Sequence, residues 1–414
     1  MLGLAIVAAI FIAYMLMEHR FETRVSGPMI FMTLGLLISP EVFNVFRLDL
    51  EGLSVQVVLK GALALVLFTE ASTLRTRRLA TGIELPARLL VVAMPLIMIF
   101  GLIVAAVLFG VLSFWEAAVV AVLLAPTDAA LVLPVVDNDR VPQRIRDALV
   151  VEGGLNDGLA VPFVLFAAGM ADVAAGARTS PGLAGLLISQ IGIAILVGVG
   201  AGWLGSKAAV AANRAGWASQ TGIQLGLFGL AVATFAAAEG LHGNGFIAVW
   251  LTGLLLGHFA TEEVLEGRTF SLRLSQLLVM LSFMIFGALG LAPFISTLTW
   301  QIVLYAILSL LVLRPLAVGL SLLGSGEGLR TAGFLGWFGP RGLPSMVLAL
   351  IVMKKDFSLP NGDLILGVMA TTVALSVYAH GLTAWPLSNR YADWYEKLGS
   401  GTGNAELEAN GADR

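Results

Sequence analysis

Two acidic side chains interrupt an apolar stretch where residues 152–158 read Glu-Gly-Gly-Leu-Asn-Asp-Gly. A carboxylate at the depth of a bilayer is costly, so such residues usually have a function. Glu152 and Asp157 are five positions apart, and helix positions with that spacing do not share a face. We therefore expect the two carboxylates to have different neighbours and different roles.

Glu152 requires a cation, and the best candidate is Arg314, which lies in another apolar segment. Loss of one partner of a buried ion pair typically costs about 3–5 kcal/mol because a bare charge remains. We therefore predict that Glu152 and Arg314 form a structural ion pair. Asp157 has no such basic candidate, and its neighbour Asn156 is neutral and only donates or accepts hydrogen bonds. An unpaired buried carboxylate can exchange protons near cellular pH, which makes Asp157 the main candidate for binding.

Apolar segments that cross a bilayer must position these residues. Hydrophobic side chains make up 58% of the 414 residues and charged ones only 12%. About twenty consecutive apolar residues cross a bilayer, and we count thirteen such spans, at about 2–17, 26–45, 53–74, 89–110, 115–136, 147–171, 184–211, 220–239, 244–260, 271–291, 299–323, 330–353 and 361–387. The sequence therefore predicts an all-α integral membrane protein. The first span is expected to be retained rather than cleaved as a signal peptide.

The distribution of lysine and arginine predicts the orientation of the spans, because basic connections stay in the cytoplasm. Seventeen of the 24 basic residues fall in odd-numbered connections or the C-terminal segment, and four fall in even-numbered connections. We therefore expect the N-terminus outside and the C-terminus in the cytoplasm. The composition, rich in alanine and glycine, is compatible with a bacterial inner membrane. The absence of cysteine excludes disulfides and thiolate metal sites.

Six spans, a long seventh span and six further spans indicate two inverted six-helix repeats joined by a linker helix. The transmembrane domain is predicted at 1–398, with repeat one at about 1–171, the linker at about 184–211 and repeat two at about 220–387. The remaining residues, 399–414, are small and polar, and we expect them to form a disordered cytoplasmic tail.

Both predicted repeats contain a proline-interrupted segment at the fifth position, namely 125–129 (Ala-Pro-Thr-Asp-Ala) and 338–344 (Phe-Gly-Pro-Arg-Gly-Leu-Pro). Proline removes an amide donor and obstructs the preceding turn. The prolines alone are equally compatible with two simple kinks, but the equivalent positions and opposite charges favour two crossed, broken helices. In that arrangement Asp128 would neutralise the positive N-terminal helix ends and Arg341 the negative C-terminal ends.

These residues resemble the NhaP-type branch of the monovalent cation:proton antiporters, which includes the animal sodium/proton exchangers. The resemblance runs from residues 35–40 (Gly-Leu-Leu-Ile-Ser-Pro) to 336–342 (Gly-Trp-Phe-Gly-Pro-Arg-Gly) and so covers nearly the whole chain. It implies a homodimer in which each subunit has thirteen spans, a dimerisation part and a six-helix core that holds the crossed broken helices. It implies no cofactor and no enzymatic activity.

The resemblance also assigns roles to particular residues. Thr127-Asp128 is similar to the family's Thr-Asp-Pro break, and Asn156-Asp157 to its Asn-Asp pair, in which the aspartate binds cation or proton in turn. Glu152 with Arg314 looks like its buried ion pair. Glu70 on its own fits an interfacial acid that reaches water, whereas the resemblance implies that it helps to hold the cation.

Two positions depart from the family pattern. Ala129 stands where a proline usually follows Thr-Asp, so the extent of unwinding beside Asp128 is open. Gly153 stands where relatives commonly have serine, which removes a hydroxyl that could ligate the ion.

The function predicted from this pattern is electroneutral exchange of one Na⁺ or Li⁺ for one proton by alternating access. Sodium, a hard ion, would be held by oxygens of Asp157, Asp128 and Thr127, with Asn156 and Glu70 nearby. Potassium/proton exchange by the same fold is the alternative. From other classes, an intramembrane aspartyl protease would use Asp128 and Asp157 as a dyad, and a passive channel is disfavoured because no filter motif is present.

Overall fold

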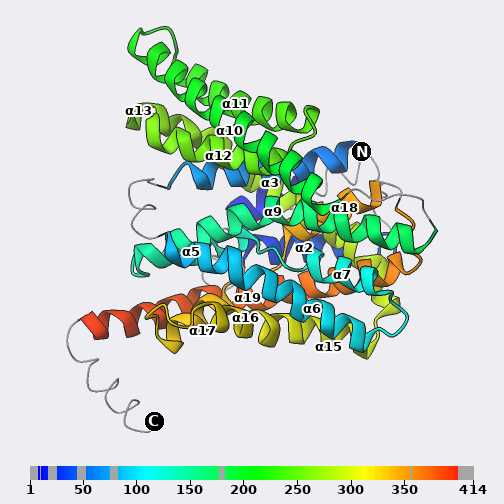
Figure 1. Ribbon diagram of the computed structural model, residues 1–414. Helices are drawn as coiled ribbons and strands as arrows, with labels where there is room; N and C mark the ends of the chain where they lie inside the picture. The colour runs from blue at the N-terminus through cyan, green and yellow to red at the C-terminus, as the bar shows by residue number, and fades with distance from the viewer. Residues whose placement is uncertain are drawn as a thin grey trace.

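The computed structural model describes residues 8–9, 11–16, 26–43, 53–74, 83–176, 182–354 and 357–399. Regular secondary structure in these ranges is entirely helical (Figure 1). Helices long and apolar enough to cross a bilayer span Glu84–Leu108, Gln143–Ala174, Leu183–Arg214, Gln220–Gly240, Glu262–Thr297, Trp300–Ser321 and Gly362–Leu398. The prediction of an all-helical membrane protein is confirmed. Half of the first predicted span (residues 2–7, 10 and 17) and residues 400–414 of the predicted tail lie outside the described residues.

The first part of the chain forms helices α2 (Gly27–Ile38), α3 (Leu53–Ala71), α5 (Glu84–Arg88), η1 (Leu89–Ala93), α6 (Met94–Leu108), α7 (Phe114–Leu123), α8 (Ala129–Val136) and α9 (Gln143–Ala174). A long helix, α10 (Leu183–Arg214), occupies the predicted linker. The later part forms α11 (Gln220–Gly240), α12 (Gly245–Phe259), α13 (Glu262–Leu265), η2 (Glu266–Arg268), α14 (Thr269–Ile285), η3 (Phe286–Leu291), η4 (Ala292–Thr297), α15 (Trp300–Leu308), η5 (Ser309–Leu313), α16 (Arg314–Ser321), α17 (Leu329–Trp337), α18 (Leu343–Lys354) and α19 (Gly362–Gly399).

The two halves share a local distortion. In the first half, the π-helical turn η1 directly precedes Met94-Pro95; in the second, η5 directly precedes Arg314-Pro315. Proline donates no amide and its ring crowds the preceding turn, so the helix widens there. The same sequence of π turn, proline and broken helix therefore occurs in both halves, which is the pattern expected of an internal repeat.

The two breaks lie in the interior of the molecule, where Asp128 and Arg341 are buried. In Figure 1, α10–α13 gather on one side and α15–α17 on the opposite side, with α3 and α9 between them. Helix α9 packs against α7, α8 and α18, while α19 packs against α7 and α8 from another direction. Both breaks are therefore enclosed by protein, which is the condition under which unpaired backbone is tolerated at membrane depth.

Candidate ion-binding site

The first break is the segment between α7 and α8, residues 124–128. Asp128 caps α8, because its Oδ1 accepts a hydrogen bond of 2.9 Å from the amide of Ala130. The Asp128 amide in turn donates to the carbonyl of Pro340 at 2.7 Å. The break thus forms without a proline at position 129, where Ala129 begins α8, and it contacts the second break directly.

Asp128 also caps the second broken helix. Its Oδ2 accepts a 2.7 Å hydrogen bond from the amide of Leu343, the first residue of α18. A Cβ atom on Gly342 would lie 1.9 Å from that same oxygen, so only glycine permits the approach. One carboxylate therefore satisfies amides at two helix N-termini, where negative charge is favourable.

Arg341 occupies the opposite, carbonyl-rich side of the crossing. Its guanidinium donates to the carbonyls of Ala125 and Pro126, the latter at 2.8 Å, and the side chain is completely buried. Its amide donates to the Ser376 hydroxyl of α19. The carbonyls released at the end of α7 are thereby paired with a cation, as expected for the negative end of a helix.

Glu152 and Arg314 are in direct contact. The guanidinium donates to both carboxylate oxygens, at 2.7 and 3.0 Å, and also to the carbonyl of Leu335 at 3.2 Å. Arg314 is 1% exposed and Glu152 is 3% exposed. A Cβ atom on Gly339 would lie 1.6 Å from Arg314 Nε, so the second break supplies the space in which this arginine lies.

Asp157 has a different environment from Glu152. It is 2% exposed, and neither carboxylate oxygen has a hydrogen-bond partner among the described residues. Its neighbour Asn156 donates from Nδ2 to the Thr127 hydroxyl at 2.7 Å, which ties α9 to the first break. Asp128 and Glu70 are close enough to interact electrostatically with Asp157. Asp157 is therefore a buried carboxyl group without a hydrogen-bond partner among the described residues, and two other acids lie near it.

The carboxyl groups of Asp157, Asp128 and Glu70 lie near one another but do not form a ready-made set of metal ligands. In the described residues, no three acidic or histidine side chains converge closely enough to hold a metal ion. Both oxygens of Asp128 are engaged by backbone amides, so this residue contributes mainly charge. Of the two aspartates, Asp157 is the one whose oxygens have no hydrogen-bond partner among the described residues.

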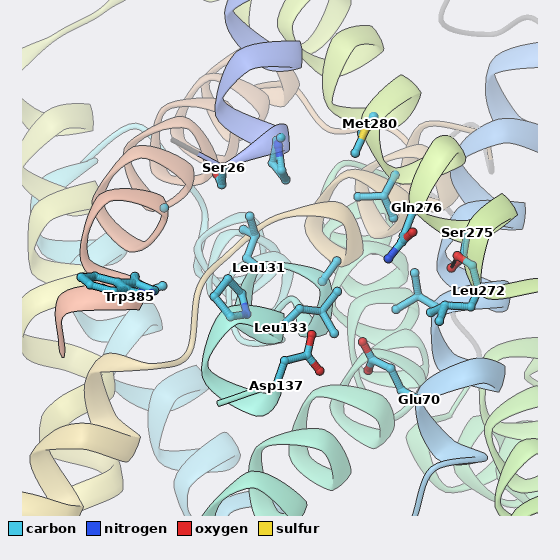
Figure 2. A pocket seen from close by; sticks show the side chains of 18 of the residues that line it. Ser26, Glu70, Leu131, Leu133, Asp137, Leu272, Ser275, Gln276, Met280 and Trp385 are labelled. Atoms are coloured by element: carbon cyan, nitrogen blue, oxygen red, sulfur yellow. Dashed lines mark hydrogen bonds between the residues drawn. The ribbon is translucent and has the colours of Figure 1, made fainter. Parts of the chain in front are cut away.

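Glu70 is 8% exposed, and both of its carboxylate oxygens lack partners among the described residues. It lines a cavity of about 540 Å³ between α3, α8, α14 and α19. Figure 2 shows its carboxylate turned toward that of Asp137, which follows the last residue of α8. Sequence reasoning missed Asp137, although an acid directly after a broken helix was an available signal.

The two departures from the family pattern lie against each other. A Cβ atom on Gly153 would come within 3.2 Å of the Ala129 Cβ, a tighter contact than most real Cβ atoms make. The glycine therefore lets α9 approach the start of α8 closely. Gly153 and Ala129, the two departures from the family pattern, therefore lie at the same contact between α9 and α8.

Comparison with known proteins agrees with this geometry. The family described as "Sodium/hydrogen exchanger, transmembrane" matches residues 6–390. The structure of the sodium proton antiporter MjNhaP1 from Methanocaldococcus jannaschii at pH 8 is 22% identical and covers 94% of this chain and 97% of its own, with a TM-score of 0.76. An electron-microscopy map of the same antiporter gives 22% identity, 96% and 95% coverage, and a TM-score of 0.68. The expected resemblance is confirmed, and this chain belongs to the sodium/hydrogen exchanger family.

Proposed function

We propose that this protein exchanges one Na⁺ or Li⁺ for one proton, with the two ions competing for Asp157. The observation that carries the proposal is the pair of buried, unpartnered oxygens on Asp157. A carboxylate in that environment is unstable as a bare anion, so it binds either a proton or a cation. Because the site holds one positive charge at a time, each transport cycle exchanges one monovalent cation for one proton, and the exchange is electroneutral.

Neighbouring groups give the cation its further ligands. Sodium and lithium are hard ions that prefer several oxygen ligands. The Thr127 carbonyl and water complete the shell in this proposal, while Asp128 adds negative charge. Asn156 holds the Thr127 hydroxyl and carries no charge itself, which supports one-for-one exchange. Gly153 provides no hydroxyl, so water or a backbone carbonyl takes the place of that ligand.

The cavity indicates which side of the membrane the structure faces. Its lining includes Ser26, Asp137 and Asn389, and each of these lies at the end of a span that the distribution of basic residues assigns to the cytoplasm. We infer a cytoplasm-facing state of an alternating-access cycle, with the C-terminus inside and the N-terminus outside a bacterial inner membrane. A homodimer is inferred from the family resemblance.

Other functions are less well supported. Membership of an exchanger family makes the chain a transporter and not an enzyme, so the aspartyl protease alternative is rejected. The engagement of both Asp128 oxygens by backbone amides also argues against a shared-proton dyad with Asp157. Potassium in place of sodium remains the alternative substrate.

The test is Asp157→Asn in reconstituted vesicles that carry an imposed pH gradient and a fluorescent pH indicator. Lithium, sodium and potassium are added separately, and recovery of fluorescence reports cation-coupled proton movement. We expect response to sodium and lithium in the parent protein and none in the variant. Asp172→Asn is the matched control, because Asp172 lies on the same helix and accepts a bond from the Ser358 amide. Exchange retained by Asp157→Asn would refute the proposal, and a response to potassium alone would change the substrate.

A further inference from the structure

The cavity beside Glu70 contains a second acid that the exchange mechanism does not use. Asp137 and Glu70 line the same space from different helices, α8 and α3, and their carboxylates face each other (Figure 2). The two belong to opposite walls of the cavity, so no local turn or helix cap explains why they meet.

No basic side chain lines this cavity among the described residues. Its other polar groups are neutral oxygen-bearing side chains, including Asn138, Ser275 and Gln276. Arg146 does not line the cavity; it attracts Asp137 electrostatically, but its guanidinium donates hydrogen bonds to Asp139, at 2.8 Å, and to the carbonyl of Val136. The cavity is therefore negative, with neutral oxygens around its acids.

Glu70 supplies an independent indication that a ligand belongs here. It is more than nine-tenths buried, faces the cavity, and has two oxygens without partners among the described residues. The hydroxyl of its neighbour Thr69 is directed to the carbonyls of Leu65 and Val66 and so is not available to it. Two facing carboxylates repel when both are ionised, and a cation placed between them would remove that repulsion.

The acids also follow one another in space from the cavity toward the exchange site. Asp137 is exposed, Glu70 is 8% exposed and Asp157 is 2% exposed, and Glu70 and Asp137 line the cavity whereas Asp157 does not. Glu70 also lies within electrostatic range of both Asp137 and Asp157. Glu70 therefore lies between the outer acid and the exchange site. A cation that leaves Asp137 and Glu70 has an acid to move toward.

We propose that Glu70 and Asp137 form a second, weaker site for a monovalent cation, which captures the ion in the cavity before it reaches Asp157. This inference rests on the proposed exchange function. Two carboxylates and neutral side-chain oxygens suit a hard, partly hydrated cation. A negative cavity with apolar walls raises the local concentration of cations. Asp137 is thus a residue that sets the apparent affinity for the transported ion without taking part in the competition with protons.

The test measures the sodium dependence of exchange for Asp137→Asn in the vesicle assay. We expect the KM for sodium to rise on the order of tenfold with little change in maximal rate. Asp137→Glu keeps the charge, and its KM for sodium is expected to stay close to that of the parent. Glu84→Gln is the matched control, because Glu84 is an exposed acid paired with Arg88 that does not line the cavity. The KM difference should also shrink as an impermeant salt is added, because salt screens the attraction.

A purely structural role for Asp137 gives a different result, in which the maximal rate falls and added salt has no effect on the difference. Either that result or an unchanged KM would overturn the capture site. These outcomes are separate from failure of the exchange proposal, which is judged by Asp157→Asn alone. If Asp137→Asn does not elute as a folded protein, Asp137→Glu and the salt dependence of the parent KM decide the matter, since a KM insensitive to salt contradicts capture by charge.

Discussion

Replacement of either partner in the Glu152–Arg314 pair should destabilise the protein strongly. Both side chains are almost fully buried, and the contact has two hydrogen bonds, at 2.7 and 3.0 Å. Arg314→Met and Glu152→Met each leave one charge buried without its partner, which typically costs about 3–5 kcal/mol. The double variant leaves no bare charge at this position. It loses mainly the bond to the Leu335 carbonyl, worth about 1 kcal/mol.

The two single variants should differ from each other because Arg341 lies within electrostatic range of both partners. After Arg314→Met, the remaining Glu152 is still attracted to Arg341. After Glu152→Met, Arg314 and Arg341 are two like charges in a buried site and repel. We therefore expect Glu152→Met to be the less stable variant, and the double variant to be more stable than either.

Thermal unfolding in detergent, followed by the loss of the folded peak in size-exclusion chromatography, measures this order. A change of 3–5 kcal/mol corresponds to a shift of roughly several °C in melting temperature. Additive losses in the double variant would show that the two residues act independently, which would refute the ion-pair interpretation. A lower melting temperature for Arg314→Met than for Glu152→Met would refute the argument from Arg341.

Two further predictions concern the remaining parts of the site. Gly153→Ser should lower the melting temperature by crowding Ala129, since overpacking typically costs about 1–3 kcal/mol. Adding Ala129→Gly to this variant should recover part of the loss. A double variant whose melting temperature falls by the sum of the two single losses would count against this contact. Asp137 is exposed, but partial desolvation at the cavity wall raises its pKa; Asp139 adds to this shift and Arg146 opposes it. The carboxyl therefore loses its charge at a higher pH than an ordinary aspartate. The KM difference between Asp137→Asn and the parent should therefore be largest at high pH and disappear as the pH falls through the pKa of Asp137. Sodium titrations at several pH values would measure this change. A KM difference that grows at low pH would contradict the prediction.

The features that could be predicted from sequence are those that composition and proline determine locally. Long apolar segments predict the helices, and the prolines at 126 and 340 predict the breaks, because a missing amide weakens a helix wherever it occurs. The contact between Glu152 and Arg314 could be predicted because two opposite charges in apolar segments have few other partners.

Other features depend on the three-dimensional fold and could not be predicted from sequence. The bond from Leu343 to Asp128 joins residues 215 positions apart and exists only because the breaks cross. The pairing of Asp137 with Glu70 across a cavity similarly requires α8 and α3 to meet.

Glu152, Asp128 and Asp157, the buried acids on α9 and at the first break, differ in their partners. Glu152 has a guanidinium, Asp128 has two backbone amides, and Asp157 has no partner among the described residues. The first two have their charge compensated by groups that belong to the fold, so binding a proton or a cation would displace an existing interaction. Asp157 would gain an interaction by binding either ion and lose none. Under the proposed exchange mechanism, Asp157 is therefore favoured over Glu152 and Asp128 as the acid that binds the ion, and these two paired acids keep the crossing in place while the occupant of Asp157 changes. Glu70, which also lacks a partner among the described residues, belongs to the proposed capture site.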